Sequence, residues 1–172
     1  DINLKTLCID ENLIEKSISE KTKIILIIHY AGISPDMNKI KKIASKHNIL
    51  LIEDCAQAFS SLFKKSNLGT FGDIACLSFH ETKNIISGEG GCIVVNNKKF
   101  KKRSEYIWEK GTNRLDFQKG KFDKYTWVDI GSSFLPSEIT SAFLWSQLKH
   151  SKSIIKKRII LWKNYKKFFD SF

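Results

Sequence analysis

The chain has 172 residues, of which 42% are hydrophobic and only two are proline, and this composition excludes a disordered protein. No stretch approaches the roughly 18 consecutive apolar residues of a membrane-spanning helix, so we expect no membrane partner. The net charge is +11, but its arginines are only Arg103, Arg114 and Arg158. Because recognition of phosphates and bases favours Arg, the excess of Lys predicts a solvated surface rather than a nucleic-acid interface.

The cysteines show no CxxC spacing, and three of them lie in or beside apolar runs. Buried thiols are therefore expected, in a reducing cytoplasm. The four histidines do not pair with the cysteines at the intervals of metal ligands, so the sequence predicts no metal site.

Four short apolar runs indicate β-strands, at residues 24–28, 49–52, 74–77 and 92–95. Nearly continuous apolar runs are typical of strands that are buried on both faces, in a sheet covered by helices. Between the first two runs, Ser34, Pro35 and Asp36 predict a helix start with proline in the first helical position. The pattern is a βαβ unit with parallel neighbouring strands.

The remaining segments are expected to be mostly helical. Apolar spacing predicts a short helix over residues 10–18, another over 97–109, and helices from residue 136 to the C-terminus. Residues 111–133 contain aromatic side chains without clear periodicity, which predicts a long, partly ordered loop.

Polar side chains follow the first three strands, where ligands bind in open α/β sheets. They are His29 and Tyr30, then Glu53, Asp54 and Gln57, then Ser78, His80 and Lys83. Each group also has an ordinary interpretation. Acidic residues at strand ends commonly cap the next helix, and most lysines of so lysine-rich a chain are surface residues.

The surroundings of Lys83 favour a functional site. Residues 78–84 read Ser-Phe-His-Glu-Thr-Lys-Asn, and residues 88–91 read Gly-Glu-Gly-Gly. Glycines permit positive φ and close approach of the backbone to a ligand.

Together with residues 29–32, 53–57 and 68–73, these two segments resemble the DegT/DnrJ/EryC1/StrS family of sugar aminotransferases over nearly the whole chain. The resemblance implies an α/β fold similar to aspartate aminotransferase, with a mostly parallel sheet and helices on both faces. Residues 1–148 would be part of the large domain of a type I pyridoxal phosphate-dependent transferase. Residues 149–172 would be a helix that leads towards a small domain.

The resemblance also implies the roles of individual residues. Lys83 and Asp54 would be catalytic: Lys83 would form the Schiff base with pyridoxal 5'-phosphate, and Asp54 would keep the pyridine nitrogen protonated. Gln57 would bind near the ring hydroxyl, and Ser78 would donate to the phosphate. Ser133 would bind the phosphate of the neighbouring subunit in a homodimer. Because sugar dehydratases of the family carry histidine in place of Lys83, the sequence favours transamination.

Three segments are most similar to the branch of the family that aminates dTDP-4-dehydro-6-deoxyglucose for enterobacterial common antigen. They are residues 80–84, 109–114 and 123–133. The expected reaction moves an amino group from an amino acid to C4 of this nucleotide-linked sugar, and the expected amino donor is glutamate.

The chain begins at Asp1 without an initiator Met, and the family's upstream phosphate loop and most of its small domain are not recognisable. We therefore expect a fragment of an aminotransferase. Two alternatives remain: a truncated, catalytically inactive chain that keeps the fold, and a lysine-rich nucleic-acid-binding protein, for which the sequence shows no pattern of interleaved aromatic and basic residues.

Overall fold

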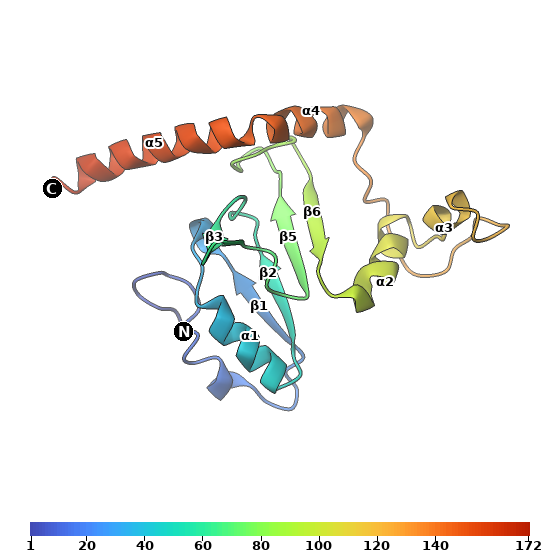
Figure 1. Ribbon diagram of the computed structural model, residues 1–172, viewed down its shortest axis with the longest axis horizontal. Helices are drawn as coiled ribbons and strands as arrows, with labels where there is room; N and C mark the ends of the chain where they lie inside the picture. Colours follow the sequence, from blue (N-terminus) through green and yellow to red (C-terminus); the bar gives the residue numbers. More distant parts are fainter. The chain divides into compact units, whose positions relative to one another are not determined.

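The computed structural model describes residues 1–172, which form two compact units (Figure 1). The first unit comprises Asp1–Leu77 and Ile93–Pro136. The second unit comprises Ser78–Cys92 and Ser137–Phe172.

The main sheet has four strands in the order β1-β2-β5-β6. β1 and β2 are parallel, as are β2 and β5. Backbone hydrogen bonds join Phe79 to Gly90 and Asn96 to Asp73, so the end of β5 meets the start of β6 and β6 runs antiparallel. The mostly parallel α/β sheet predicted from the sequence is confirmed. The strands are β1 (Ile24–Ile28), β2 (Leu50–Asp54), β5 (Ile74–Ser78) and β6 (Gly91–Val95).

One face of the sheet carries the hydrophobic core. Helix α1 (Met37–Lys46) buries Met37, Ile40, Ile43 and Ala44 in the same core cluster as Ile27. Burial alternates along β1, so that Ile25 and Ile27 are buried. On the opposite face Ile24, Leu26 and Ile28 are about half exposed, at 48%, 54% and 53%.

The expectation of strands buried on both faces is therefore wrong. An apolar run shows that both faces can be buried, but α1 packs on one of them only. The expectation of buried cysteines holds for Cys8 and Cys55, whereas Cys76 and Cys92 are exposed.

Helix α1 begins two residues later than the sequence predicts. Asp36 is the N-cap, and its carboxylate accepts hydrogen bonds from the backbone N–H groups of Asn38 and Lys39. Pro35 precedes the cap instead of occupying the first helical position. The Ser34 hydroxyl donates to the Pro35 carbonyl, so it does not cap the helix, and Asp36 does so instead.

Short elements fill the rest of the N-terminal half. The helix expected over residues 10–18 is reduced to one 3-10 turn, η1 (Glu15–Ser17), and a second, η2 (Tyr30–Gly32), follows β1. Strands β3 (Leu62–Phe63) and β4 (Ser66–Asn67) form a small antiparallel hairpin. Lys64 and Lys65 both have positive φ, as a two-residue turn of the type I′ class requires.

Residues 109–133 are more ordered than expected. They follow helix α2 (Lys98–Trp108), which is capped by Asn97, and they contain helix α3 (Arg114–Gln118). The Asn113 side chain accepts from the Thr126 N–H and donates to the Lys124 carbonyl. Side-chain hydrogen bonds of this kind have no periodicity, so hydrophobic spacing misses them.

The second unit contains the loop after β5 and two helices, α4 (Glu138–Lys149) and α5 (Ser151–Phe169). Ser137 caps α4 by accepting from the Thr140 N–H, which confirms the predicted helix. Neither these helices nor the shorter ones combine the length and the apolar character needed to cross a membrane.

Candidate active site

The end of β2 places two adjacent carboxylates on opposite faces of the sheet. Side chains alternate along a strand, so Glu53 lies on the core face with Leu51, and Asp54 lies on the other face. Glu53 is 0% exposed and Asp54 is half-buried. Asp54 is in register with Ile28 of β1 and Cys76 of β5.

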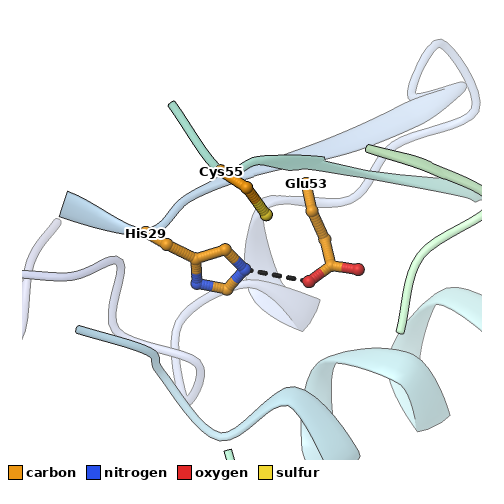
Figure 2. Close-up of side chains that lie close together, drawn as sticks. All are labelled: His29, Glu53 and Cys55. Atoms are coloured by element: carbon orange, nitrogen blue, oxygen red, sulfur yellow. Dashed lines mark hydrogen bonds and ion pairs between the residues drawn. The ribbon is translucent and has the colours of Figure 1, made fainter. Parts of the chain in front are cut away.

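The Glu53 carboxylate accepts four hydrogen bonds inside the core. Oε2 accepts from Nε2 of His29 at 2.9 Å and from the Gly69 N–H at 2.8 Å. Oε1 accepts from the Phe71 and Gly72 N–H groups, both at 2.7 Å. Figure 2 shows the imidazole of His29 aimed at this carboxylate, with Cys55 beside them. Glu53 therefore fixes the turn over residues 69–72 rather than capping the next helix.

These contacts determine the ionisation of Glu53. Burial raises its pKa, but the hydrogen bonds from His29, Gly72, Gly69 and Phe71 together outweigh burial and hold the pKa below its ordinary value. Burial, with the nearby carboxylates of Glu53 and Asp54, raises the pKa of the Cys55 thiol to about 12.

His29, Glu53 and Cys55 offer potential metal ligands within 4.8 Å of one another. Both carboxylate oxygens of Glu53 already accept N–H donors, so the charge of this buried group is satisfied without a cation. The cluster is a hydrogen-bonded part of the core.

Asp54, the last residue of β2, and Gln57, three residues later, keep polar atoms available. One oxygen of Asp54, Oδ1, accepts from the Ala56 N–H at 2.9 Å, while Oδ2 takes part in no hydrogen bond. The amide oxygen of the exposed Gln57 accepts from the Ala31 N–H at 2.7 Å, so its NH₂ group points away from this contact. An acceptor for a protonated ring nitrogen and a donor for a ring hydroxyl are thus both present, which fits a pyridine-based cofactor.

Ser78 is the last residue of β5, and Lys83 lies in the loop that follows it; both belong to the second unit. The loop is closed by hydrogen bonds from the Phe79 N–H to the Gly90 carbonyl and from the Ser87 N–H to the Phe79 carbonyl, at 2.9 and 2.7 Å. Gly90 has φ +150°, and a Cβ there would lie 2.6 Å from Oγ of Ser87. Glycine is therefore required at position 90. Lys83 is half-buried, and its backbone N–H donates to the His80 carbonyl, which places it in a defined turn.

Ser133 lies in the first unit, where it pairs with Glu109 in an isolated β-bridge. It is exposed and available as a hydrogen-bond donor. Of the residues expected from the sequence, Asp54, Gln57 and Ser133 thus lie in the first unit, and Ser78 and Lys83 lie in the second.

The expectation that His29 and Glu53 face a ligand is wrong. Both are buried, at 1% and 0% exposure. The alternation of side chains along a strand could have shown this. Glu53 is two residues from the buried Leu51 and so shares its face, whereas Asp54 is three residues away and lies on the other face.

Solved structures share this fold. The chain superimposes with a TM-score of 0.78 on PseC from Helicobacter pylori, an aminotransferase of pseudaminic acid biosynthesis, at 31% identity over 87% of this chain and 39% of PseC. The putative sugar aminotransferase Spr1654 from Streptococcus pneumoniae gives a TM-score of 0.85 over 98% of this chain and 48% of its own. At 23% identity, this second match shows the fold alone. The fold is that of the α/β aminotransferases.

The DegT/DnrJ/EryC1/StrS aminotransferase family matches residues 1–172, and the chain belongs to this family. GDP-perosamine synthase from Escherichia coli O157:H7 is 35% identical over 92% of this chain and 42% of its own length. The chain spans less than half the length of this relative and of PseC.

Proposed function

We propose that this chain is the part of a sugar aminotransferase that binds pyridoxal 5'-phosphate through Lys83 and Asp54. Two kinds of observation support the proposal. The family and the relatives are aminotransferases, and the PseC and GDP-perosamine synthase names concern sugar biosynthesis. The observation that carries it is the end of β2, where Asp54 has an unoccupied carboxylate oxygen beside the anchored amide of Gln57.

Bound pyridoxal phosphate supplies an electron-accepting ring that makes the substrate C–H bond acidic. Asp54 would keep the ring nitrogen protonated through its Oδ2, since a carboxylate stabilises the adjacent cation. Gln57 would donate its NH₂ to the ring hydroxyl and orient the ring.

Lys83 would hold the cofactor covalently and move the proton of the substrate carbon on its Nζ, because only a primary amine does both. Ser78 would donate its hydroxyl to the phosphate. Ser133 would serve the phosphate of a second subunit, which makes a homodimer part of the proposal.

The proposed acceptor is C4 of a dTDP-linked 4-keto-6-deoxy sugar, with glutamate as the amino donor. The support is the similarity of residues 80–84, 109–114 and 123–133 to the corresponding branch of the family. GDP-perosamine synthase and the UDP-sugar transaminase of Helicobacter pylori are named for other nucleotides. GDP-linked and UDP-linked keto-sugars are therefore the competing substrates to assay. We place the reaction in the cytoplasm.

Reductive trapping tests the proposal. The full chain is incubated with pyridoxal phosphate, reduced with borohydride, digested and mapped by mass spectrometry. We expect the label on the peptide that contains Lys83, and its loss in Lys83→Arg. Lys99→Arg, a substitution on α2, is the control and should leave the Lys83 label unchanged. Labelling spread evenly over the lysines would refute the role of Lys83.

A further inference from the structure

The proposed function uses Asp54 but gives no role to the buried pair of Glu53 and His29. A carboxylate that is 0% exposed is retained only where its charge is satisfied, and here four N–H donors lie within 2.9 Å. Such a group does more than fill space, because apolar side chains of similar size pack a core without this cost.

The buried pair joins three separate segments. His29 follows β1, Glu53 belongs to β2, and the Gly69 and Gly72 N–H groups belong to the turn that leads to β5. The same turn is held from a fourth place, since the Asn96 side chain donates to the Gly69 and Gly72 carbonyls at 2.9 and 2.8 Å. The position of the end of β2 is thus fixed on its core face.

The cofactor-facing residues are attached to this pair through the backbone. Asp54 is the next residue after Glu53, and its carbonyl accepts from the His29 N–H at 3.0 Å. Two residues after His29, Ala31 has the left-handed φ of +53° and donates to the amide oxygen of Gln57 at 2.7 Å. His29 therefore bonds to Glu53 through its ring, to Asp54 through its backbone, and leads into the turn that holds Gln57.

We infer that Glu53 and His29 are positioning residues that fix Asp54 and Gln57 in the geometry that the cofactor requires. The inference rests on the proposed function for the identity of the cofactor. Both are buried on the core face, so each would act through the residue on the opposite face or through the following turn.

The chemistry of Glu53 makes the inference testable. Both of its oxygens act as acceptors, whereas glutamine has one oxygen and one NH₂ group. In Glu53→Gln an N–H donor therefore faces backbone N–H donors, either at Phe71 and Gly72 or at Gly69. The turn or the end of β2 has to move.

The experiment measures amide hydrogen exchange of the full chain by NMR. The reporters are the Ala56 N–H, which donates to Asp54, and the Ala31 N–H, which donates to Gln57. Exchange is referenced to the amides of α1, which report global opening. In Glu53→Gln we expect both reporters to exchange at least about 10-fold faster relative to α1. A change below about twofold, with faster exchange at Gly69 and Gly72, would confine Glu53 to the turn and overturn the inference.

A pair of variants at His29 decides the question if Glu53→Gln does not fold. Both keep the carboxylate and its three backbone hydrogen bonds. His29→Leu removes the ring donor and should speed exchange at Ala31, whereas His29→Gln restores an N–H donor of similar reach and should bring the rate back towards the parent value. Equal rates in the two variants would contradict a role for the hydrogen bond.

Glu15→Gln is the matched control. Glu15 also pairs with a histidine, His47, at 2.8 Å, but this pair is on the surface, with side-chain exposures of 42% and 30%. We expect no change at Ala31 or Ala56.

Trapping with pyridoxal phosphate separates the two proposals. If Glu53 acts through Asp54, Glu53→Gln lowers the yield of trapped Lys83, and adding it to Asp54→Asn lowers that yield no further. If the two substitutions lower the yield of trapped Lys83 additively, the positioning role of Glu53 is overturned, while the proposed function still stands. If the parent chain gives no Lys83 label, the proposed function fails, while the exchange experiment still decides whether Glu53 positions Asp54.

Discussion

Replacing Gly111 by alanine tests how tightly residues 109–133 are packed. Gly111 has φ +75°, and a Cβ there would lie 2.0 Å from the Asp129 carbonyl oxygen and 3.0 Å from the Gly131 N. Both neighbours are backbone atoms, so no side chain can rotate away to make room. The variant must displace the segment around Asp129.

The displacement breaks specific hydrogen bonds. The Gly111 carbonyl accepts from Val128 and Asp129, and the Gly111 N–H donates to the Tyr106 carbonyl at 2.7 Å. Three backbone hydrogen bonds at about 1 kcal/mol each give roughly 3 kcal/mol. The left-handed backbone adds about 1 kcal/mol for any residue with a Cβ. We expect a loss of about 4 kcal/mol in the local opening free energy.

Gly120 provides the matched control, because it has φ +68° but nothing within 4 Å of the added Cβ. Gly120→Ala should cost only the backbone contribution of about 1 kcal/mol. Hydrogen exchange of peptides from residues 109–133 measures both losses, with urea unfolding of the whole chain alongside. Equal losses in the two variants would refute the tight packing of Gly111 against Asp129.

Four further outcomes are expected. In the complete enzyme, Asp54→Asn should lower turnover at least about 1000-fold, or roughly 4 kcal/mol, in a coupled transamination assay, and should lower the yield of the trapped Lys83 adduct far less. Because the pKa of Glu53 is lowered from 4.5, its ionisation stabilises the fold above that pH, and this contribution is lost as the pH falls through the lower folded value. Glu53→Gln should therefore give a flatter dependence of unfolding free energy on pH below 4.5. Iodoacetamide should modify the exposed Cys76 well before the buried Cys55, whose pKa is about 12, as peptide mapping would show. Asp36→Ala should lower the unfolding free energy by about 1 kcal/mol through loss of the α1 cap, measured in urea, with Asp36→Asn close to the parent.

The sequence predicts the strands and the order of the polar groups because these depend on short-range pattern. Apolar runs locate β1, β2, β5 and β6 within one or two residues, and the motif around Lys83 leads to the family that the comparisons confirm. The placement of Asp54 and Gln57 after β2 follows from the same pattern.

Other features depend on contacts that no local pattern encodes. The burial of His29 results from its bond to Glu53, 24 residues away. The order of residues 109–133 results from hydrogen bonds of Asn113 and Gly111 to distant backbone groups. Whether Leu26 is covered depends on which element packs on that face, and its hydrophobicity is the same in either case.

The uncovered face of β1 also affects how the chain behaves in solution. β1 is the edge strand of its sheet, so unpaired backbone groups adjoin the exposed Ile24, Leu26 and Ile28. The net charge of +11, to which Lys21 and Lys23 just before the strand contribute, repels one chain from another. This repulsion has a range of about 10 Å at 0.1 M salt and about 3 Å at 1 M. We therefore expect the chain to stay dispersed in dilute buffer and to aggregate through these apolar edges in concentrated salt.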